Sequence, residues 1–299
     1  MRLLQLLCLC MKHIDKEDNR EWILEENMER KTIGFIGLGN MAKAIIGGLL
    51  QNGFEKEQII GSAKTEKTLL KVKNDFGIMT CLDNKQVAKQ ADIVVLAVKP
   101  QMIDGVLKEI GESLKEDVIV ISILAGKTIS YLENGIGRRV KMARCMPNVA
   151  SLVGEGCTAV CYNKECEDWD KPYVTEILES IGMVKEVSEN LMDAVIGASG
   201  SSPAFVFMMI EAMADAVVKA GMRRDLAYEM VAQAVLGSAK LFLESETALG
   251  EKMHPAQLKD MVCSPGGTTI EGVKALEEGG FRGVLMEAVE ATIAKSKLL

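Results

Sequence analysis

Between Thr32 and about Glu189 the chain alternates short apolar runs with longer amphipathic segments. Two of the runs, Asp92–Val98 and Val118–Leu124, are almost continuously apolar, which is typical of strands buried on both faces. The pattern predicts strands over Thr32–Ile36, Gln58–Ile60, Ile78–Cys81, Asp92–Val98, Val118–Leu124, Val140–Ala143, Thr158–Val160 and Val184–Val187. It predicts helices over Met41–Gln51, Lys67–Phe76, Asn84–Gln90 and Met102–Ile110, and a helix that starts at Ile129–Leu132. Strands that alternate with helices indicate βαβ units and a mostly parallel sheet.

After about Asn190 the pattern becomes helical, with few β-branched runs. The predicted helices are Leu191–Ala220, Leu226–Glu246, Ala256–Val262, Thr269–Glu278 and Arg282–Lys297. The segment Ala204–Ala220 is apolar on more than one face, so it needs neighbours on several sides. We therefore predict an all-α domain over residues 191–299 that is buried in part against another subunit.

Residues 1–30 precede the first predicted strand. The apolar run that ends near Met11 is too short to span a bilayer, and no small-residue cleavage site follows it. A polar stretch, Lys12–Arg30, comes next, and it contains Met28 just before the strand. We expect a disordered extension, or a start codon placed upstream of the true one, rather than a targeting segment. No other segment combines transmembrane length with an absence of charge, so we expect no membrane association.

Composition and charge exclude several classes of protein. The chain is 48% hydrophobic and 26% charged, as in ordinary globular proteins, and its formal net charge of −7 offers no basic surface for nucleic acid. His13 and His254 are the only histidines, which argues against a Ser-His-Asp hydrolase and against most metal sites. None of the eight cysteines belongs to a Cys-x-x-Cys pair. We therefore expect reduced thiols in a cytoplasmic protein that holds no metal.

The segment Gly34–Ala42 combines the end of a strand, a glycine turn and the start of a helix. Within it, Gly37-x-Gly39-x-x-Ala42 matches the Rossmann dinucleotide fingerprint, in which the first glycine allows the turn and the second lets the backbone approach a pyrophosphate. The alternative is a purely structural glycine turn. We predict a Rossmann-type NAD(P)-binding domain over residues 31–190. The cofactor-binding residues predicted in the turn are Ile36, Gly37, Leu38, Gly39, Asn40 and Met41.

The end of the second predicted strand bears on the choice of cofactor. An NAD site usually places an acidic residue about 20 residues after the glycines, where it binds the ribose 2′-hydroxyl. Here that place is taken by Gly61-Ser62-Ala63-Lys64, which has a hydroxyl and an ammonium group but no acid. Ser62 and Lys64 suit a 2′-phosphate, so we predict NADPH as cofactor, with NADH still possible. The alternative for Lys64 is a solvated surface lysine.

A second candidate site is the stretch Asp260–Thr269. Pro265 and the following glycine pair end one predicted helix, and Thr268-Thr269 opens the next. The unpaired N–H groups and hydroxyls at such a helix start suit a small carboxylate. The alternative is a threonine that only caps the helix after a glycine turn.

Three further stretches either contact a ligand or only complete local structure. Ala97-Val98-Lys99-Pro100 follows a buried strand, at the position where open α/β sheets bind ligands. Asn148 follows a later strand and is a similar case. Ser199–Pro203 precedes the long apolar helix, where it also fits a simple helix start with proline in the first turn.

Taken together, these stretches resemble the pyrroline-5-carboxylate reductase family, from about Lys31 to the C-terminus. The last of the matching motifs is the most specific and the first is the least. The motifs are GFIGLGNMA at Gly34–Ala42, AVKPQ at Ala97–Gln101, RCMPN at Arg144–Asn148, SGSSPAF at Ser199–Phe205, and HPAQLKDMVCSPGGTTIEGV at His254–Val273.

The resemblance implies the last reaction of proline biosynthesis, in which NAD(P)H reduces (S)-1-pyrroline-5-carboxylate to L-proline. It implies a helical domain that interlocks two subunits, and often a ring of dimers. Carried over by position, Thr269 would hydrogen-bond the ring nitrogen as the catalytic residue. Ser264 and the amides of Gly267 and Thr268 would hold the carboxylate. Asn84 and the residues from Ala97 to Pro100 would line the cofactor site.

The chain departs from the family pattern at two positions: Ser202 stands where glycine is usual, and Phe205 stands where tyrosine is usual. The second change removes a hydroxyl near the expected site, and with it one possible hydrogen bond. The extension over residues 1–30 has no counterpart in the family.

Two other functions remain open from the sequence. A β-hydroxyacid dehydrogenase also joins a Rossmann domain to helices, but it uses a helix lysine, for which Lys219 and Lys240 are the candidates here. A non-catalytic NADP-binding regulatory protein is the other alternative. The intact PGGTT turn argues against it, because a cofactor sensor has no need of a second anion site.

Overall fold

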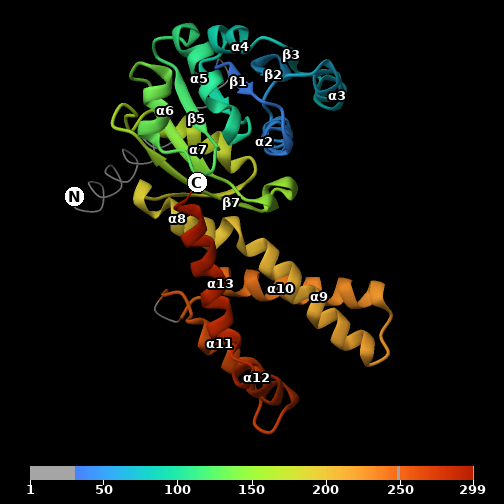
Figure 1. Ribbon diagram of the computed structural model, residues 1–299. Helices are drawn as coiled ribbons and strands as arrows, with labels where there is room; N and C mark the ends of the chain where they lie inside the picture. The colour runs from blue at the N-terminus through green and yellow to red at the C-terminus, as the bar shows by residue number, and fades with distance from the viewer. Residues whose placement is uncertain (1–30, 248–249, 299) are drawn as a thin grey trace, which may run out of the picture. The chain divides into compact units, whose positions relative to one another are not determined.

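The computed structural model describes residues 31–247 and 250–298, so the predicted extension over residues 1–30 lies outside the described part. The chain divides into two compact units (Figure 1). The first, an α/β unit, runs to Gly200 and takes in the last residues from Lys295. The second, a helical unit, is Ser201–Ala294. The domain boundary predicted from the sequence, at residue 190, falls somewhat earlier in the chain.

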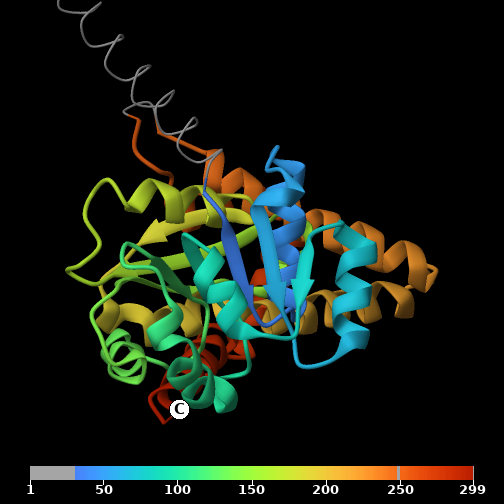
Figure 2. The same ribbon diagram turned by 90° about the horizontal axis from the view of Figure 1, so that it is seen from above.

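The α/β unit is built on one eight-stranded sheet with the order β3-β2-β1-β4-β5-β6-β7-β8 (Figures 1 and 2). The six strands from β1 to β6 are parallel, β7 runs antiparallel to β6, and β8 runs parallel to β7. The prediction of a mostly parallel Rossmann-type sheet is therefore confirmed. The strands are β1 Ile33–Ile36, β2 Ile59–Ser62, β3 Met79–Cys81, β4 Ile93–Leu96, β5 Ile119–Ser122, β6 Lys141–Met146, β7 Gly156–Tyr162 and β8 Gly182–Glu186.

Helices cover both faces of this sheet. The main ones are α2 Asn40–Gln51, α3 Glu66–Phe76, α4 Asn84–Gln90, α5 Ile103–Ile110, α6 Ile129–Ile136 and α7 Lys171–Glu179. Short 3₁₀ turns join them: η1 Lys56–Gln58, η2 Pro100–Met102, η3 Gly111–Ser113, η4 Val149–Val153 and η5 Glu189–Leu191.

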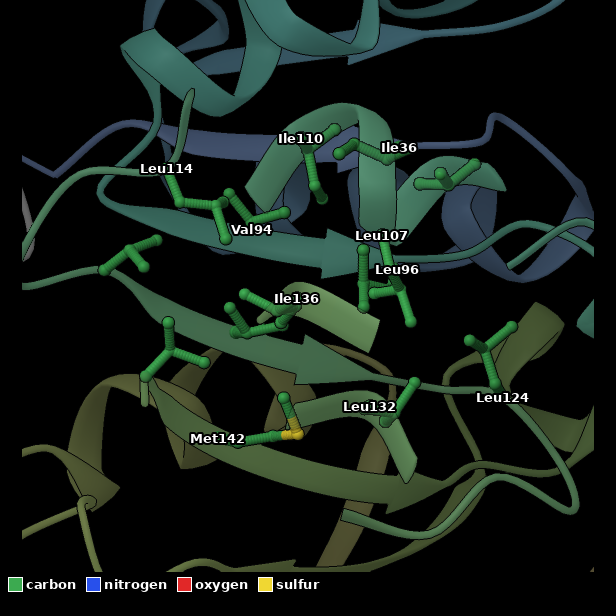
Figure 3. Packing of buried hydrophobic residues seen from close by; sticks show 14 of the residues in the cluster. Ile36, Val94, Leu96, Leu107, Ile110, Leu114, Leu124, Leu132, Ile136 and Met142 are labelled. Atoms are coloured by element: carbon green, nitrogen blue, oxygen red, sulfur yellow. The ribbon is translucent and has the colours of Figure 1, made fainter. Parts of the chain in front are cut away.

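Successive side chains of the central strands enter two different cores. In β4, Val94 and Leu96 pack with α4, α5 and α6 in one hydrophobic cluster, part of which is drawn in Figure 3. Ile93 and Val95 of the same strand pack with α2, α3 and α7 in the other. Because the side-chain period of a strand is two, a strand covered on both faces has to be apolar at every position. This explains the continuous apolar runs of the sequence.

Helix α7 was not predicted from the sequence. It buries Val174, Ile177 and Leu178 against the sheet, at helical spacing. Buried Asp170 directly precedes it without capping it, and its carboxylate accepts hydrogen bonds from Lys141 Nζ (2.9 Å) and from the Glu167 N–H (3.0 Å). The helix is short and begins in a polar segment, so its three apolar positions are a weak signal in the sequence.

The segment Leu191–Ala220, predicted as one helix, is not a single regular α-helix in the structure. The structure has α8 at Met192–Val195, a π-helical turn, η6, at Ile196–Gly200, and then α9 at Ser202–Lys219. Pro203 has no N–H, so it cannot donate to the carbonyl of Ser199 one turn earlier. The helix therefore changes its hydrogen bonding just before Pro203, and the Ser199 carbonyl accepts from Asn148 Nδ2 instead, at 3.1 Å.

The helical unit contains α9, α10 (Arg224–Glu244), α11 (Pro255–Val262), α12 (Thr268–Glu278) and most of α13 (Phe281–Ser296). Among its described residues, only Ala214, Ala227 and Val231 form a buried cluster. Large apolar side chains such as Phe207 and Met208 are 62% and 68% exposed in the single chain. A helical unit with so small a core needs apolar partners from outside itself.

Two helical stretches, Glu189–Lys219 and Arg224–Glu244, are long and apolar enough to cross a membrane when judged by length and composition alone. Both stretches contain charged residues, whereas the expectation from the sequence concerned segments without charge. The core helix of a soluble assembly passes the same test.

Candidate active site

The glycine turn after β1 is shaped for close approach to a ligand. Gly37 has φ +98°, a conformation that favours glycine, and its N–H donates to the Ser62 carbonyl at 3.0 Å. Helix α2 then starts at Asn40, with Gly39 as a cap that provides no side-chain hydrogen bond and no acidic residue in the first turn. The first N–H groups of α2 thus have no side-chain acceptor, and no negative charge offsets the helix dipole. This arrangement fits a pyrophosphate.

A cavity of about 760 Å³ lies beside this turn. Most of the predicted cofactor-binding residues line it: Gly37, Leu38, Gly39, Ser62, Lys64, Asn84, Ala97, Val98 and Lys99. They come from the ends of β1, β2 and β4 and from the start of α4, so the parallel sheet brings together residues that are far apart in sequence. A cavity at the carboxyl ends of these strands is where a Rossmann-type sheet binds its nucleotide.

The remaining predicted cofactor residues lie elsewhere. Ile36 is fully buried in β1, and Asn40 and Met41 form the first turn of α2. Asn40 lines a separate cavity of about 460 Å³ between residues of α2 and η4. Pro100 begins η2, directly after Lys99.

A hydrogen-bond chain crosses the wall of the large cavity. Ser62 Oγ donates to Asn84 Oδ1 at 2.7 Å, and Asn84 Nδ2 donates to Glu109 Oε2 at 2.8 Å. A carboxylate only accepts, so the amino group of Asn84 must face Glu109. Ser62 is fully buried and its hydroxyl is turned to Asn84, whereas Lys64 is exposed and forms no ion pair with the described residues. Lys64 is thus the free cation at the end of β2.

Asn148 has a structural role that the sequence did not reveal. Its Oδ1 accepts from the Cys157 N–H at 3.1 Å, while its Nδ2 donates to the Ser199 carbonyl. The side chain therefore joins the segment after β6 to β7 and to the π-helical turn. Both ends of the amide are used within the α/β unit, which leaves Asn148 one amino hydrogen and one oxygen lone pair for a ligand.

In the helical unit, the turn between α11 and α12 forms the second anion site. Pro265 and Gly266, with φ +65° at Gly266, have the residue pattern of a type II turn, closed by the Gly267 N–H donating to the Ser264 carbonyl at 3.0 Å. Helix α12 starts at Thr268 with Gly267 as its cap and no side-chain cap. The amides of Thr268 and Thr269 therefore lack a side-chain acceptor.

The geometry differs from the sequence expectation at Gly267. Its amide was expected to hold the substrate carboxylate, but it is already used to close the turn. The groups available at this helix start are the amides of Thr268 and Thr269 and the hydroxyl of exposed Ser264. Among the described residues no cluster of His, Cys, Asp or Glu is arranged to hold a metal ion.

Comparisons with known proteins decide the family. The family model for pyrroline-5-carboxylate reductase dimerisation matches residues 189–299. The pyrroline-5-carboxylate reductase of Escherichia coli is 46% identical over 273 residues, which cover 91% of this chain and 99% of that protein. This chain belongs to the pyrroline-5-carboxylate reductase family. The resemblance inferred from the motifs is confirmed.

Other relatives of this reductase agree. Human pyrroline-5-carboxylate reductase 2 is 40% identical over 90% of this chain and 83% of its own. A solved pyrroline-5-carboxylate reductase from Coxiella burnetii has TM-score 0.83 and 35% identity, covering 89% of this chain and 97% of that one. The Plasmodium falciparum enzyme, solved with NADP bound, has TM-score 0.80 and 36% identity, covering 90% and 98%. A family model described as NADP oxidoreductase, coenzyme F420-dependent, matches residues 32–126.

Some residues of the reductase's cofactor cavity were missed from the sequence. Met102, Gly105, Val106 and Glu109 line it from η2 and α5. Their spacing places them on one face of a helix, but the same pattern also describes an ordinary buried face. Only the sheet order, which sets β4 next to β1, shows that this face borders the nucleotide cavity.

Proposed function

We propose that this chain reduces (S)-1-pyrroline-5-carboxylate to L-proline with NADPH as hydride donor, the last step of proline biosynthesis. The observation that carries the proposal is the uncapped start of α12 in the SPGGTT turn, in a chain 46% identical to a named reductase over most of its length. NAD(P)H use is supported by the NADP-bound relative and by the dinucleotide cavity.

The residues of the large cavity fit a dinucleotide phosphate. The free N–H groups at the start of α2 bind the pyrophosphate, and the exposed ammonium of Lys64 binds the 2′-phosphate. Ala97, Val98 and Lys99 follow β4 and line the same cavity as the glycine turn. When bound, NADPH supplies the hydride.

At the second site, the amides of Thr268 and Thr269 and the hydroxyl of Ser264 hold the substrate carboxylate. Thr269 Oγ hydrogen-bonds the ring nitrogen, so that the C=N bond lies in one orientation. The hydride adds to the imine carbon, the C=N π electrons become a lone pair on nitrogen, and the nitrogen keeps or gains one proton. A protonated imine is already electrophilic, so positioning and hydrogen bonding suffice and no strong side-chain acid is required.

A simple assay tests the proposal. Purified protein is mixed with NADPH and racemic pyrroline-5-carboxylate, and the loss of reduced-cofactor absorbance is followed. Formation of proline in step with NADPH oxidation supports the reaction. Turnover of 3-hydroxyisobutyrate instead would indicate a β-hydroxyacid dehydrogenase, and cofactor binding without turnover of any imine would indicate a regulatory protein. Lys240, a candidate base of the first rival, forms an i,i+4 ion pair with Glu244 on an exposed helix face.

Lys64→Ala is expected to weaken NADPH binding about tenfold and to leave NADH binding within about twofold of wild type, because only the 2′-phosphate loses a charge-assisted contact. Dissociation constants measured from cofactor fluorescence check this result. Lys67→Ala removes a neighbouring exposed charge of α3 that does not line the cavity, so it is the control. Equal losses for both cofactors would contradict a 2′-phosphate contact.

We also propose that the protein is a cytoplasmic homodimer, with a ring of dimers as the larger assembly. The exposed apolar side chains of α9 and α10 then pack against the same helices of a second copy, as the dimerisation family model suggests. In this assembly the partner chain, and not a membrane, covers the apolar side chains of α9 and α10. Sedimentation of the purified protein at micromolar concentration is expected to give at least the mass of a dimer, and a monomer would contradict the assembly.

A further inference from the structure

The end of η2 and one face of α5 form an apolar part of the wall of the nucleotide cavity. Met102, Gly105 and Val106 lie along this part of the wall. A Cβ added at Gly105 would meet nothing within 4 Å, so the missing side chain leaves open space in the wall. An apolar wall beside a few polar groups is the environment that small ring ligands occupy in proteins.

A polar pair ends this wall. Glu109, one turn after Val106, is half-buried and accepts a hydrogen bond from Asn84 Nδ2 at 2.8 Å. Glu109 forms no ion pair with any described cation, and its second carboxylate oxygen has no donor among the same residues. The second amino hydrogen of Asn84 likewise has no protein acceptor in the described part of the chain. A free acceptor and a free donor therefore stand side by side at the cavity wall.

The orientation of this pair is set from within the protein. Buried Ser62 donates to Asn84 Oδ1, and the amide cannot turn over without placing its oxygen against the Glu109 carboxylate. Two acceptors facing each other in a half-buried site are unfavourable. The cavity wall therefore presents a carboxylate acceptor, from Glu109 of α5, next to an amide donor, from Asn84 of α4.

We propose that Glu109 and Asn84 read the amino edge of the adenine ring, with Glu109 determining the specificity for the base. Adenine carries an exocyclic amino donor next to a ring-nitrogen acceptor, which is the complement of this pair. The ring lies on the wall of Met102, Gly105 and Val106, the 6-amino group donates to Glu109, and Asn84 donates to the neighbouring ring nitrogen. A base with a 6-oxo group places a carbonyl oxygen against the Glu109 carboxylate and is disfavoured.

The inference rests on the dinucleotide site of the proposed function, and it is tested by binding rather than turnover. The wild-type protein is titrated with NADPH and with its hypoxanthine analogue, deamino-NADPH, which differs by a 6-oxo group in place of the 6-amino group. Cofactor fluorescence gives both dissociation constants. Wild type is expected to bind NADPH about tenfold more tightly than the analogue, the effect of losing one hydrogen bond to a charged group.

Glu109→Gln is expected to reduce this preference to about twofold or less, because a glutamine amide can donate to a 6-oxo group as well as accept from an amino group. Glu112→Gln, which removes the same charge from an exposed residue outside the cavity wall, is expected to keep the tenfold preference. Equal binding of the two cofactors to wild type overturns the inference without any variant. A Glu109→Gln variant that weakens both cofactors by the same factor overturns it as well, since that is the result of a purely structural role.

The outcome separates this inference from the proposed function. If NADPH binds and the imine is reduced but the base preference is absent, only the role of Glu109 fails. If neither dinucleotide binds, the dinucleotide site and the role of Glu109 fail together.

Discussion

A Gly37→Ala variant is expected to lose about 2–4 kcal/mol of unfolding free energy and to bind NADPH at least about a hundredfold more weakly. Gly37 has φ +98°, and a Cβ there would lie 2.7 Å from the Ala97 carbonyl oxygen and 2.8 Å from the Val98 nitrogen. Both atoms belong to backbone at the end of β4, which lines the cofactor cavity, so relief of the clash would distort the cavity itself. Thermal unfolding followed by circular dichroism and a cofactor titration measure the two effects.

Gly39→Ala is the matched control for the loss of unfolding free energy expected of Gly37→Ala. Its backbone has φ −74°, and the nearest atom to an added Cβ is the Ala97 carbonyl oxygen at 4.0 Å. We expect this variant to unfold at the temperature of wild type but to bind NADPH more weakly, because its Cβ occupies the space through which the backbone meets a pyrophosphate. If Gly37→Ala unfolded like Gly39→Ala, the strain assigned to Gly37 would be absent.

Thr269→Ala is expected to lower kcat about a hundredfold while NADPH affinity and thermal stability stay at wild-type values. Thr269 lies in the first turn of α12 and forms no side-chain hydrogen bond with the described residues, so its removal leaves the fold intact. Steady-state kinetics with NADPH and pyrroline-5-carboxylate measure the loss. Thr269→Ser keeps the hydroxyl and is expected to retain most of the activity. Turnover of the alanine variant within about twofold of wild type would remove Thr269 from the mechanism.

Much of the fold was predictable from local pattern alone. All eight strands were expected close to their observed positions. The signal is clearest for the central ones, because strands covered on both faces are apolar at every residue, as Asp92–Val98 illustrates. Helix α7 was missed because its three buried residues are preceded by a polar segment that gives no periodic signal. The start of the long helix near Pro203 was expected, with proline in the first turn, but the π-helical turn over Ile196–Gly200 was not.

The candidate site was predictable from the sequence only where a short motif determines its own backbone geometry. The glycine turn at Gly37 and the SPGGTT turn were found from sequence because their backbone geometry depends on the residues that form them. The pairing of Asn84 with Glu109 was not, since these residues lie 25 positions apart and meet only through the order of the strands. The commitment of the Gly267 amide to its own turn was equally hidden, because it depends on which carbonyl the turn brings within reach.

The small core of the helical unit has a consequence for handling the protein. With only Ala214, Ala227 and Val231 forming a buried cluster among its described residues, this unit is expected to depend on association for much of its stability. Because association obeys mass action, dilution acts on such a protein as a denaturant does. Its melting temperature is expected to rise with protein concentration, and a sample diluted for a sensitive assay is expected to lose activity through unfolding.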